Sequence, residues 1–401
     1  MRHIRRAPRS RDVPKRTVAL AVLPVVAVLG CPAVAVADSV PPTGPALSLP
    51  VVVPTLDEGA PCRPASDREA RTPPWTQEML GLSSAWQLSR GAGVLVGVVD
   101  TGVGESVPAL AGRVSAVGDA GKDCVGHGSF VAGLAAAAPQ PDTGFTGVAP
   151  QAGILAVRGT DVRGAATPDS VARGIREAVD GGASVVTVSL ALTTNSEALS
   201  AAVRHARSRD VLVLAAAAPD RTPDGAGSSS GPSAYWPAAE EGVLSVAAFG
   251  SAGGEGPVPV PQADLAAPGV GVVSVGPSGR GAFTGSGSSF AAGVVAGTAA
   301  LVRGYRPELT ADQVARRLVA TAYPAQVPRV DPYAAVSGTV PDALPRTRTV
   351  ADPAVVPATP SDGGAVVRGR WAAVGSALLV FVLLVGAWVV PRGRARGWRA
   401  G

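Results

Sequence analysis

The chain has 401 residues, of which 46% are hydrophobic and 16% charged, enough for one large core with flanking segments. Its net charge of +5 comes from the two ends, because residues 1–37 carry +6, residues 391–401 carry +4, and residues 38–390 carry −5. The main part of the chain therefore lacks the basic character of a nucleic-acid-binding protein, and we expect no nucleic-acid partner.

The first 37 residues have the pattern of a secretory signal peptide. A basic segment, MRHIRRAPRSRDVPKR, precedes the apolar VALAVLPVVAVLG, and a small-residue cleavage site, AVA, ends the segment. We therefore predict cleavage after Ala37. Arg5-Arg6 hints at twin-arginine export, although its flanking residues do not support it. VLGC, ending at Cys31, leaves a lipoprotein signal open as a minor alternative.

Residues 38–74 are rich in proline and apolar residues without periodicity, which predicts an extension and not a domain. Once Cys31 leaves with the signal, Cys62 and Cys124 form an even pair in an exported protein. We predict that a disulfide joins them and pins the extension onto the main domain. A catalytic thiol at Cys124, three residues before His127, is the weaker alternative.

From Trp75 onward, apolar runs of strand length alternate with segments of helical pattern. This alternation predicts an α/β domain with a mostly parallel sheet over residues 75–337. A capping box formed by Thr194 and Glu197 is expected to begin one of the helices. The expected strands are 93–102, 153–159, 183–192 and 211–217, with shorter strands in 242–275, and the expected helices are 127–138, 170–182, 196–208 and 289–304.

The C-terminal part predicts a membrane anchor. A Pro/Ala-rich linker over residues 338–370 leads to the uncharged segment 371–390, which is long enough to cross a hydrocarbon core of about 30 Å as a helix. A buried core helix is disfavoured there, because the linker leaves it nothing to pack against. The arginines of the basic tail 391–401 should stay in the cytoplasm, so we expect a single-pass protein of the cell membrane with an extracytoplasmic domain.

Three motifs carry side chains suited to amide hydrolysis. VVDTGV places Asp100 at the end of a strand, GHGSFVAG places His127 at the start of a helix, and TGSGSSFAAGVVAGTAAL places Ser289 at the start of another. Hydrolysis needs a nucleophile, a base and a carboxylate that orients the base, and these residues can fill those roles. Each motif alone is weak evidence, but their joint occurrence in this order predicts a catalytic triad.

No metal or other cofactor is expected at this site. The sequence has no paired histidines and no HExxH run, which argues against a metalloprotease. His3 belongs to the predicted signal, and His205 is expected on a solvated helix face.

These motifs resemble those of subtilisin-family serine proteases and, more narrowly, of the mycosins, the membrane-anchored proteases of actinobacterial type VII secretion. The stretches that carry the resemblance are LGLSSAWQLSRGAGVLVGVVDTGV, DCVGHGSFVAG, GSGSSFAAGVVAGTAALVR and VDPYAAV. The resemblance implies a subtilisin-like three-layer fold and extracytoplasmic cleavage of protein substrates. It also implies association with a type VII secretion membrane complex and an extension that wraps the domain.

Two positions depart from the family pattern. Where such enzymes carry Gly-Asn after a strand, with the asparagine donating a hydrogen bond to the oxyanion, this chain has Ala217-Ala218. A shift of one residue does not supply the donor, because Pro219 and Asp220 are not donors of that kind. The predicted substrate-binding residues are Ser189, Leu190 and Ala191, the last standing where glycine is usual.

The expected loss of turnover favours an enzyme of reduced activity over an inactive one. In subtilisin, loss of the oxyanion amide costs about 10²–10³ in turnover, whereas loss of the nucleophile costs about 10⁶. We therefore expect a serine endopeptidase that is slow because Ala218 replaces the asparagine. Two alternatives stay open: a protease-derived scaffold that stabilises a secretion complex, and a donor supplied by water or by a hydroxyl among Ser228, Ser229 and Ser230.

Overall fold

The computed structural model describes residues 48–221, 234–258, 260, 262–340 and 363–398. The chain divides into two compact units, Met1–Val340 and Pro341–Gly401, which are described separately. The predicted signal peptide, the three candidate serines at 228–230 and most of the predicted linker lie outside the described residues.

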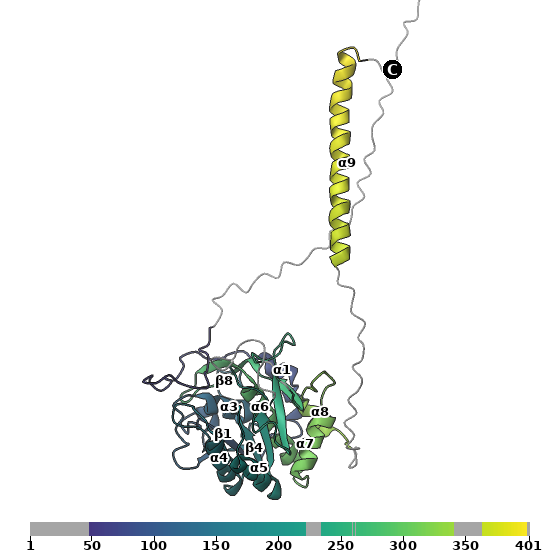
Figure 1. Cartoon of the computed structure of the whole chain (residues 1–401). Helices are drawn as coiled ribbons and strands as arrows, with labels where there is room; N and C mark the ends of the chain where they lie inside the picture. Colours follow the sequence, from purple (N-terminus) through teal and green to yellow (C-terminus); the bar gives the residue numbers. More distant parts are fainter. Residues whose placement is uncertain (1–47, 222–233, 259, 261, 341–362, 399–401) are drawn as a thin grey trace, which may run out of the picture. The chain divides into compact units, whose positions relative to one another are not determined.

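The first unit is built on a seven-stranded sheet in the order β2-β3-β1-β4-β5-β6-β7 (Figure 1). All neighbouring strands are parallel, and β4, β5, β6 and β7 are buried along their whole length, as expected when helices cover both faces. The strands are β1 Leu95–Asp100, β2 Val114–Ala116, β3 Gly153–Arg158, β4 Val185–Val188, β5 Leu212–Ala216, β6 Val243–Phe249 and β7 Leu265–Pro268.

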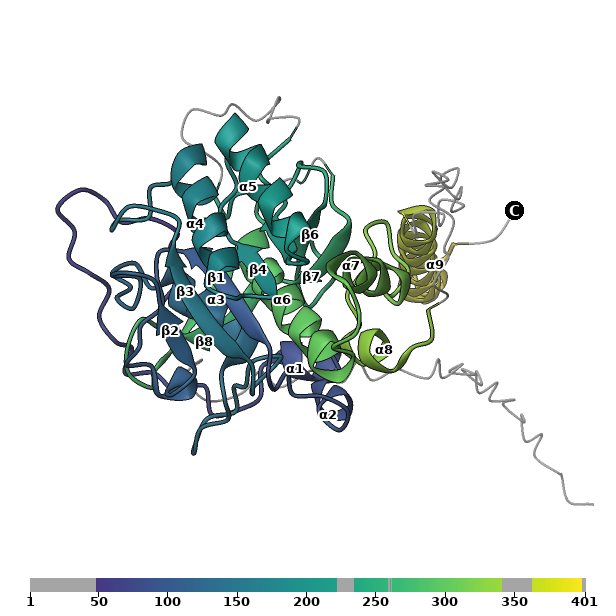
Figure 2. The ribbon, with the colours of Figure 1, turned by 90° about the horizontal axis from the view of Figure 1, so that it is seen from below.

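Helices cover the two faces of this sheet. On one face α4 (Pro168–Asp180) packs beside α5 (Glu197–Ser208), and on the other α3 (His127–Ala136) packs against α6 (Ser288–Tyr305) (Figure 2). Alternation along β1 sends Val98 to the α3–α6 side and Val99 to the α4–α5 side. The predicted three-layer subtilisin-like α/β fold is therefore confirmed.

The start of α5 differs from the prediction. Ser196 precedes the helix, and its hydroxyl accepts a hydrogen bond from the Leu199 backbone N–H at 3.2 Å. The predicted capping box of Thr194 and Glu197 was wrong. Ser196 is the N-cap residue, Thr194 lies two residues before it, and Glu197 is the first residue of the helix. The remaining elements are α1 Trp75–Met79, α2 Leu82–Ala85, η1 Pro108–Leu110, β8 Val270–Val275, β9 Ala282–Ser286, α7 Ala311–Ala320 and α8 Pro332–Ser337.

The described part of the N-terminal extension is held against the domain by backbone hydrogen bonds. The Val52 N–H donates to the Thr284 carbonyl at 2.9 Å, and the Arg63 N–H donates to the Cys124 carbonyl at 2.8 Å. The predicted disulfide between Cys62 and Cys124 is present. The extension is therefore tied to the domain both by its backbone and covalently.

The second unit contains α9 (Gly363–Ala395). Its segment Trp371–Ala395 is long and apolar enough to cross a membrane, with a mean hydropathy of 2.6. This helix contains the predicted span 371–390 and continues past Pro391 into the basic tail.

Candidate active site

The three predicted catalytic residues come from three elements that meet at one edge of the sheet. Asp100 ends β1, His127 begins α3, and Ser289 is the second residue of α6. The carboxyl ends of parallel strands lie together, and this edge is where open α/β sheets bind ligands. The fold thus brings together side chains that are up to 189 residues apart in the chain.

Their side chains form a continuous line of contacts. His127 Nδ1 lies 2.9 Å from each carboxylate oxygen of Asp100, and His127 Nε2 lies 3.1 Å from Ser289 Oγ. All three residues are at most 1% exposed, so these contacts are shielded from bulk water. The arrangement has the geometry of a nucleophile, a base and an orienting carboxylate.

An acidic residue outside the triad, Asp123, fixes the loop that leads into α3, and the sequence analysis did not identify it. Its Oδ1 accepts from the backbone N–H groups of Val125 and Gly126 at 3.1 and 2.7 Å. Its Oδ2 accepts from the N–H and the hydroxyl of Ser129 at 2.8 and 2.7 Å. Burial raises the pKa of the Asp123 carboxyl, while the hydrogen bonds from Ser129 and Gly126 oppose that rise.

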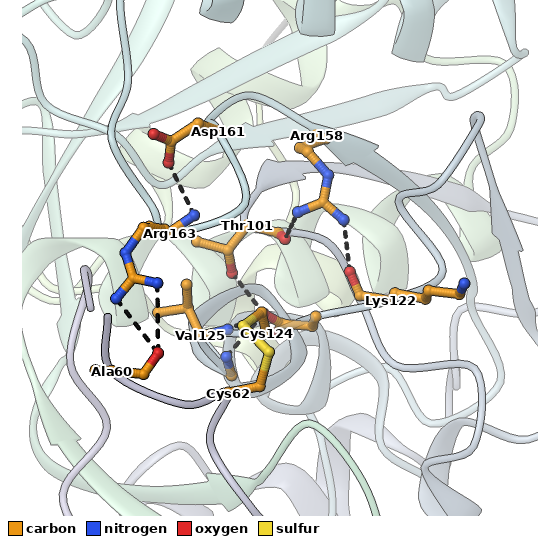
Figure 3. Close-up of a disulfide and its surroundings, with 11 residues drawn as sticks. Ala60, Cys62, Thr101, Lys122, Cys124, Val125, Arg158, Asp161 and Arg163 are labelled. Atoms are coloured by element: carbon orange, nitrogen blue, oxygen red, sulfur yellow. Dashed lines mark hydrogen bonds between the residues drawn. A yellow bond between two sulfur atoms is a disulfide. The ribbon is translucent and has the colours of Figure 1, made fainter. Parts of the chain in front are cut away.

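The disulfide reaches this same loop, because Cys124 follows Asp123 (Figure 3). Arg158 lies nearby, and its guanidinium donates to the backbone carbonyls of Thr101 and Lys122 at 2.5 and 2.6 Å. The extension is thus covalently joined to the chain three residues before His127. The alternative of a catalytic thiol at Cys124 was wrong, since its sulfur is in the disulfide.

Ala218 lies in the loop that follows β5. Its side chain is fully buried and packs in an apolar cluster with Tyr235 and Val258. The residue of this loop that reaches the nucleophile is Asp220, two positions further along. The sequence contained a signal for Asp220, because it closely follows a parallel strand. Polar residues at that position lie at the edge of the sheet where open α/β sheets bind ligands.

The Asp220 carboxylate contacts both His127 and Ser289. Its Oδ2 lies 2.8 Å from His127 Nε2 and 2.5 Å from Ser289 Oγ, and its Oδ1 accepts from the Ser289 backbone N–H at 3.2 Å. Burial by itself lowers the pKa of His127, but the carboxylates of Asp100 and Asp220 outweigh it and hold that pKa well above its usual value of 6.5.

The predicted substrate-binding residues follow β4 at the same edge. Ser189 is buried, and its hydroxyl has no hydrogen-bond partner among the described residues, whereas Leu190 and Ala191 are half-buried. The next residue, Leu192, exchanges two backbone hydrogen bonds of 2.8 Å with Trp236. No set of three His, Cys, Asp or Glu side chains in the described part of the chain is arranged to hold a metal ion.

Comparison with known proteins assigns the family. The model of the subtilase family matches residues 91–352. Mycosin-3 of Mycobacterium tuberculosis (strain ATCC 25618 / H37Rv) is 36% identical over 345 residues, covering 69% of this chain and 70% of its own length. Mycosin-4 of the same strain is 33% identical, covering 70% of this chain and 72% of its own.

Solved structures of mycosins support the same family assignment. The structure of MycP3 protease from the type VII (ESX-3) secretion system has a TM-score of 0.60 and 32% identity, covering 74% of this chain and 97% of its own. The crystal structure of MycP1 with the N-terminal propeptide removed has a TM-score of 0.58 and 30% identity, covering 67% of this chain and 98% of its own. The chain therefore belongs to the mycosins, within the subtilase family of serine endopeptidases.

Proposed function

We propose that this chain is a membrane-anchored, extracytoplasmic endopeptidase with Ser289 as nucleophile, His127 as general base and Asp100 as the orienting carboxylate. One observation carries the proposal, namely the line of contacts from Asp100 through His127 to Ser289 Oγ, with separations of 2.9 and 3.1 Å. Both distances lie within hydrogen-bond reach, which a base and its nucleophile require.

The chemistry follows from these roles. Ser289 Oγ attacks the carbonyl carbon of a peptide bond while its proton passes to His127 Nε2, which later delivers it to the leaving amine. Asp100 accepts the Nδ1–H of His127 and stabilises the imidazolium that forms. The Ser289 backbone N–H, in the first turn of α6, supplies a donor and the positive end of the helix dipole to the oxyanion.

Turnover is slow in this proposal because the sequence that follows β5, residues 217–242, contains no asparagine or glutamine that could donate an amide N–H. Ala218 stands where the family carries asparagine, and its methyl group packs into an apolar cluster. If the subtilisin figure transfers, loss of such a donor reduces turnover by about 10²–10³. The site retains its nucleophile and base, so the activity is reduced and not abolished.

The relatives suggest where the enzyme works. The structure of MycP3 is described as a protease from the type VII (ESX-3) secretion system, so association with such a membrane complex and action on protein substrates are proposed here by similarity. The segment 371–390 of α9 crosses the membrane, and the arginines that follow it stay inside. The catalytic domain then faces outward.

Labelling with a fluorophosphonate probe, which reacts with activated serines, tests the catalytic proposal. We expect slow labelling of the full-length chain in detergent and none in Ser289→Ala. Ser288→Ala is the matched control, because Ser288 is a buried neighbour on the same helix turn and should leave labelling intact. Equal labelling of the wild type and Ser289→Ala would refute the assignment.

A scaffold role is the second candidate, and the Asp220 contacts favour it, since they occupy both the base and the nucleophile. Cells carrying Ser289→Ala distinguish the two functions. Secretion that survives Ser289→Ala but fails when the whole protein is deleted supports the scaffold. Secretion that fails in both supports an essential peptidase.

A further inference from the structure

Asp220 lies inside the site, and its side chain is 6% exposed. It contacts each group that must act in peptide cleavage: the Nε2 of the base, the Oγ of the nucleophile and the backbone N–H of Ser289. A carboxylate only accepts hydrogen bonds, so these three groups must all donate to it. The resulting arrangement has direct consequences for catalysis.

The first consequence concerns the base. To take the serine proton, His127 Nε2 must itself be free of a proton. At 2.8 Å from an ionised Asp220, Nε2 is instead a donor, and Nδ1 donates to Asp100, so the ring is an imidazolium held between two carboxylates. The Ser289 hydroxyl likewise donates to Asp220, at 2.5 Å, and not to the imidazole. In this state the nucleophile is not activated.

The second consequence concerns the oxyanion. The Ser289 N–H that would bind the oxyanion is occupied by Asp220 Oδ1 at 3.2 Å. An ionised carboxylate at that position repels a developing negative charge. Gly287 makes room for it, because a Cβ built on Gly287 would lie 1.8 Å from Asp220 Oδ1. Any larger residue at position 287 would displace the Asp220 side chain.

The charged groups around Asp220 are few. His127 on α3 is the cation that contacts it in the described part of the chain, and Asp100 on β1 lies behind that imidazole, with Asp123 beyond. Arg221, the next residue of the loop, donates to the Thr55 hydroxyl of the extension at 3.0 Å. The first turn of α6 carries no acidic residue, and Ser288 and Ser289 are its first two residues. His127 is therefore the group with which Asp220 can exchange a proton directly.

We propose that Asp220 is a fourth catalytic residue, which blocks the oxyanion position while ionised and supplies the missing oxyanion donor once it has taken the proton of His127. The proposal rests on the protease function proposed above. The proton moves from His127 Nε2 to Asp220 Oδ2 across their hydrogen bond, so no atom is gained or lost. The imidazole becomes a free base, and the carboxylic acid can donate its O–H to the oxyanion, a role that buried neutral carboxyl groups fill in enzymes.

The competent state thus carries one proton shared by His127 and Asp220. With two protons on the pair the base is blocked, and with none the carboxylate opposes the oxyanion. The rate should therefore follow a bell-shaped dependence on pH. The fall of the rate at alkaline pH distinguishes this proposal from catalysis by the triad alone. A triad of Asp100, His127 and Ser289 needs only a neutral imidazole, so its rate would stay constant as the pH rises.

The test compares fluorophosphonate labelling rates of the full-length chain in detergent with those of Asp220→Asn and Asp220→Ala, from about pH 5 to about pH 10. Asp220→Asn keeps the shape of the side chain and donates at every pH. We expect its alkaline fall to vanish, so that at alkaline pH, where the wild-type carboxylate has no proton to donate, its rate should exceed the wild-type rate by about 10²-fold, the usual effect of one oxyanion donor. Asp220→Ala should lose the alkaline fall too but remain slower than Asp220→Asn. Gly287→Ala, which displaces Asp220, should resemble Asp220→Ala.

A second measurement does not depend on activity. The whole sequence contains three histidines, His3, His127 and His205, so the His127 imidazole can be assigned by NMR with a His205→Gln variant. Its titration midpoint should fall in Asp220→Asn, since one of the two flanking carboxylates is removed. An unchanged midpoint would overturn the proposal.

The two proposals fail in different ways. Labelling that depends on Ser289 but has the same rate and pH dependence in the wild type and both Asp220 variants overturns the role of Asp220 and leaves the protease standing. Absence of labelling in every variant that keeps Ser289 overturns the protease and the Asp220 proposal with it. Labelling that appears only when Asp220 is replaced supports the block and refutes the donor role.

Discussion

The Thr101 hydroxyl joins the end of β1 to the start of α3, because it accepts a hydrogen bond from the Gly128 backbone N–H at 3.0 Å. The same hydroxyl donates to Asp123 Oδ1 at 2.9 Å. Thr101 follows Asp100 in the chain and Gly128 follows His127, so this contact sets the distance between the carboxylate and the base. The geometry of the site therefore depends on residues outside the triad.

Thr101→Val should weaken both the fold and the site. The isosteric valine leaves the Gly128 N–H unpaired, which costs about 1–3 kcal/mol of unfolding free energy. Thr101→Ser keeps the hydroxyl and is the matched control. Urea denaturation measures the stability and fluorophosphonate labelling the activity; equal stability of the valine and serine variants would show that the contact is energetically unimportant.

Asp123→Ala should destabilise the chain more strongly. It removes the acceptor for the Thr101 and Ser129 hydroxyls and for three backbone N–H groups. We expect a loss on the order of 3 kcal/mol or more in unfolding free energy. The control is Asp119→Ala, four residues away, because the Asp119 side chain is 76% exposed and a surface ion pair contributes about 1 kcal/mol or less. Equal losses in the two variants would contradict this account.

Ala218→Asn should not restore a fast enzyme. The new amide would enter the buried cluster of Ala218, Tyr235 and Val258, where an unpaired polar group costs about 1–3 kcal/mol. Thermal unfolding should therefore occur at a lower temperature, with no gain in the labelling rate. A faster, equally stable Ala218→Asn would mean that position 218 does face the oxyanion.

Stability should fall on the alkaline side. The pKa of His127 is well above 6.5 in the folded chain, so the folded state binds more protons than the unfolded state between these two values. The stabilisation is fully present below about pH 6.5 and is lost as the pH rises through the folded pKa of His127. Asp220→Asn removes one flanking carboxylate and should flatten this dependence in urea titrations. An identical pH profile in the variant would count against the ion pair.

The disulfide should contribute substantially to stability. Cys62 and Cys124 are 62 residues apart, and closing a loop of this length stabilises a fold by about 2–4 kcal/mol. The double variant Cys62→Ser/Cys124→Ser should lose this amount, and reduction of the wild type should lower its stability to the same level. Equal stability of oxidised and reduced wild type would show that the disulfide adds nothing to the stability of the fold.

The sequence predicted the parts of the site that have local signals. Asp100 follows an apolar run, and His127 and Ser289 stand at helix starts among small residues, so pattern alone located them. Asp220 follows β5 closely, but no motif marks it, and its contacts with His127 and Ser289, 93 and 69 residues away in the chain, become visible only in the fold. Its role arises from the space left by Gly287 and from the turn after β5. Ala218 was located from the family pattern, but only tertiary packing shows where its side chain lies.

The attachment of the extension also determines what a break in it would do. The Arg68 carbonyl accepts from the Ala282 N–H at 2.6 Å, and the Ala70 carbonyl accepts from the Gly144 N–H at 2.7 Å, so the segment stays paired beyond Cys62. A single proteolytic nick between residues 63 and 73 would produce two polypeptides still joined by the disulfide. They would migrate together on a non-reducing gel and separate only after reduction, so cleavage of the extension is not the same event as its release.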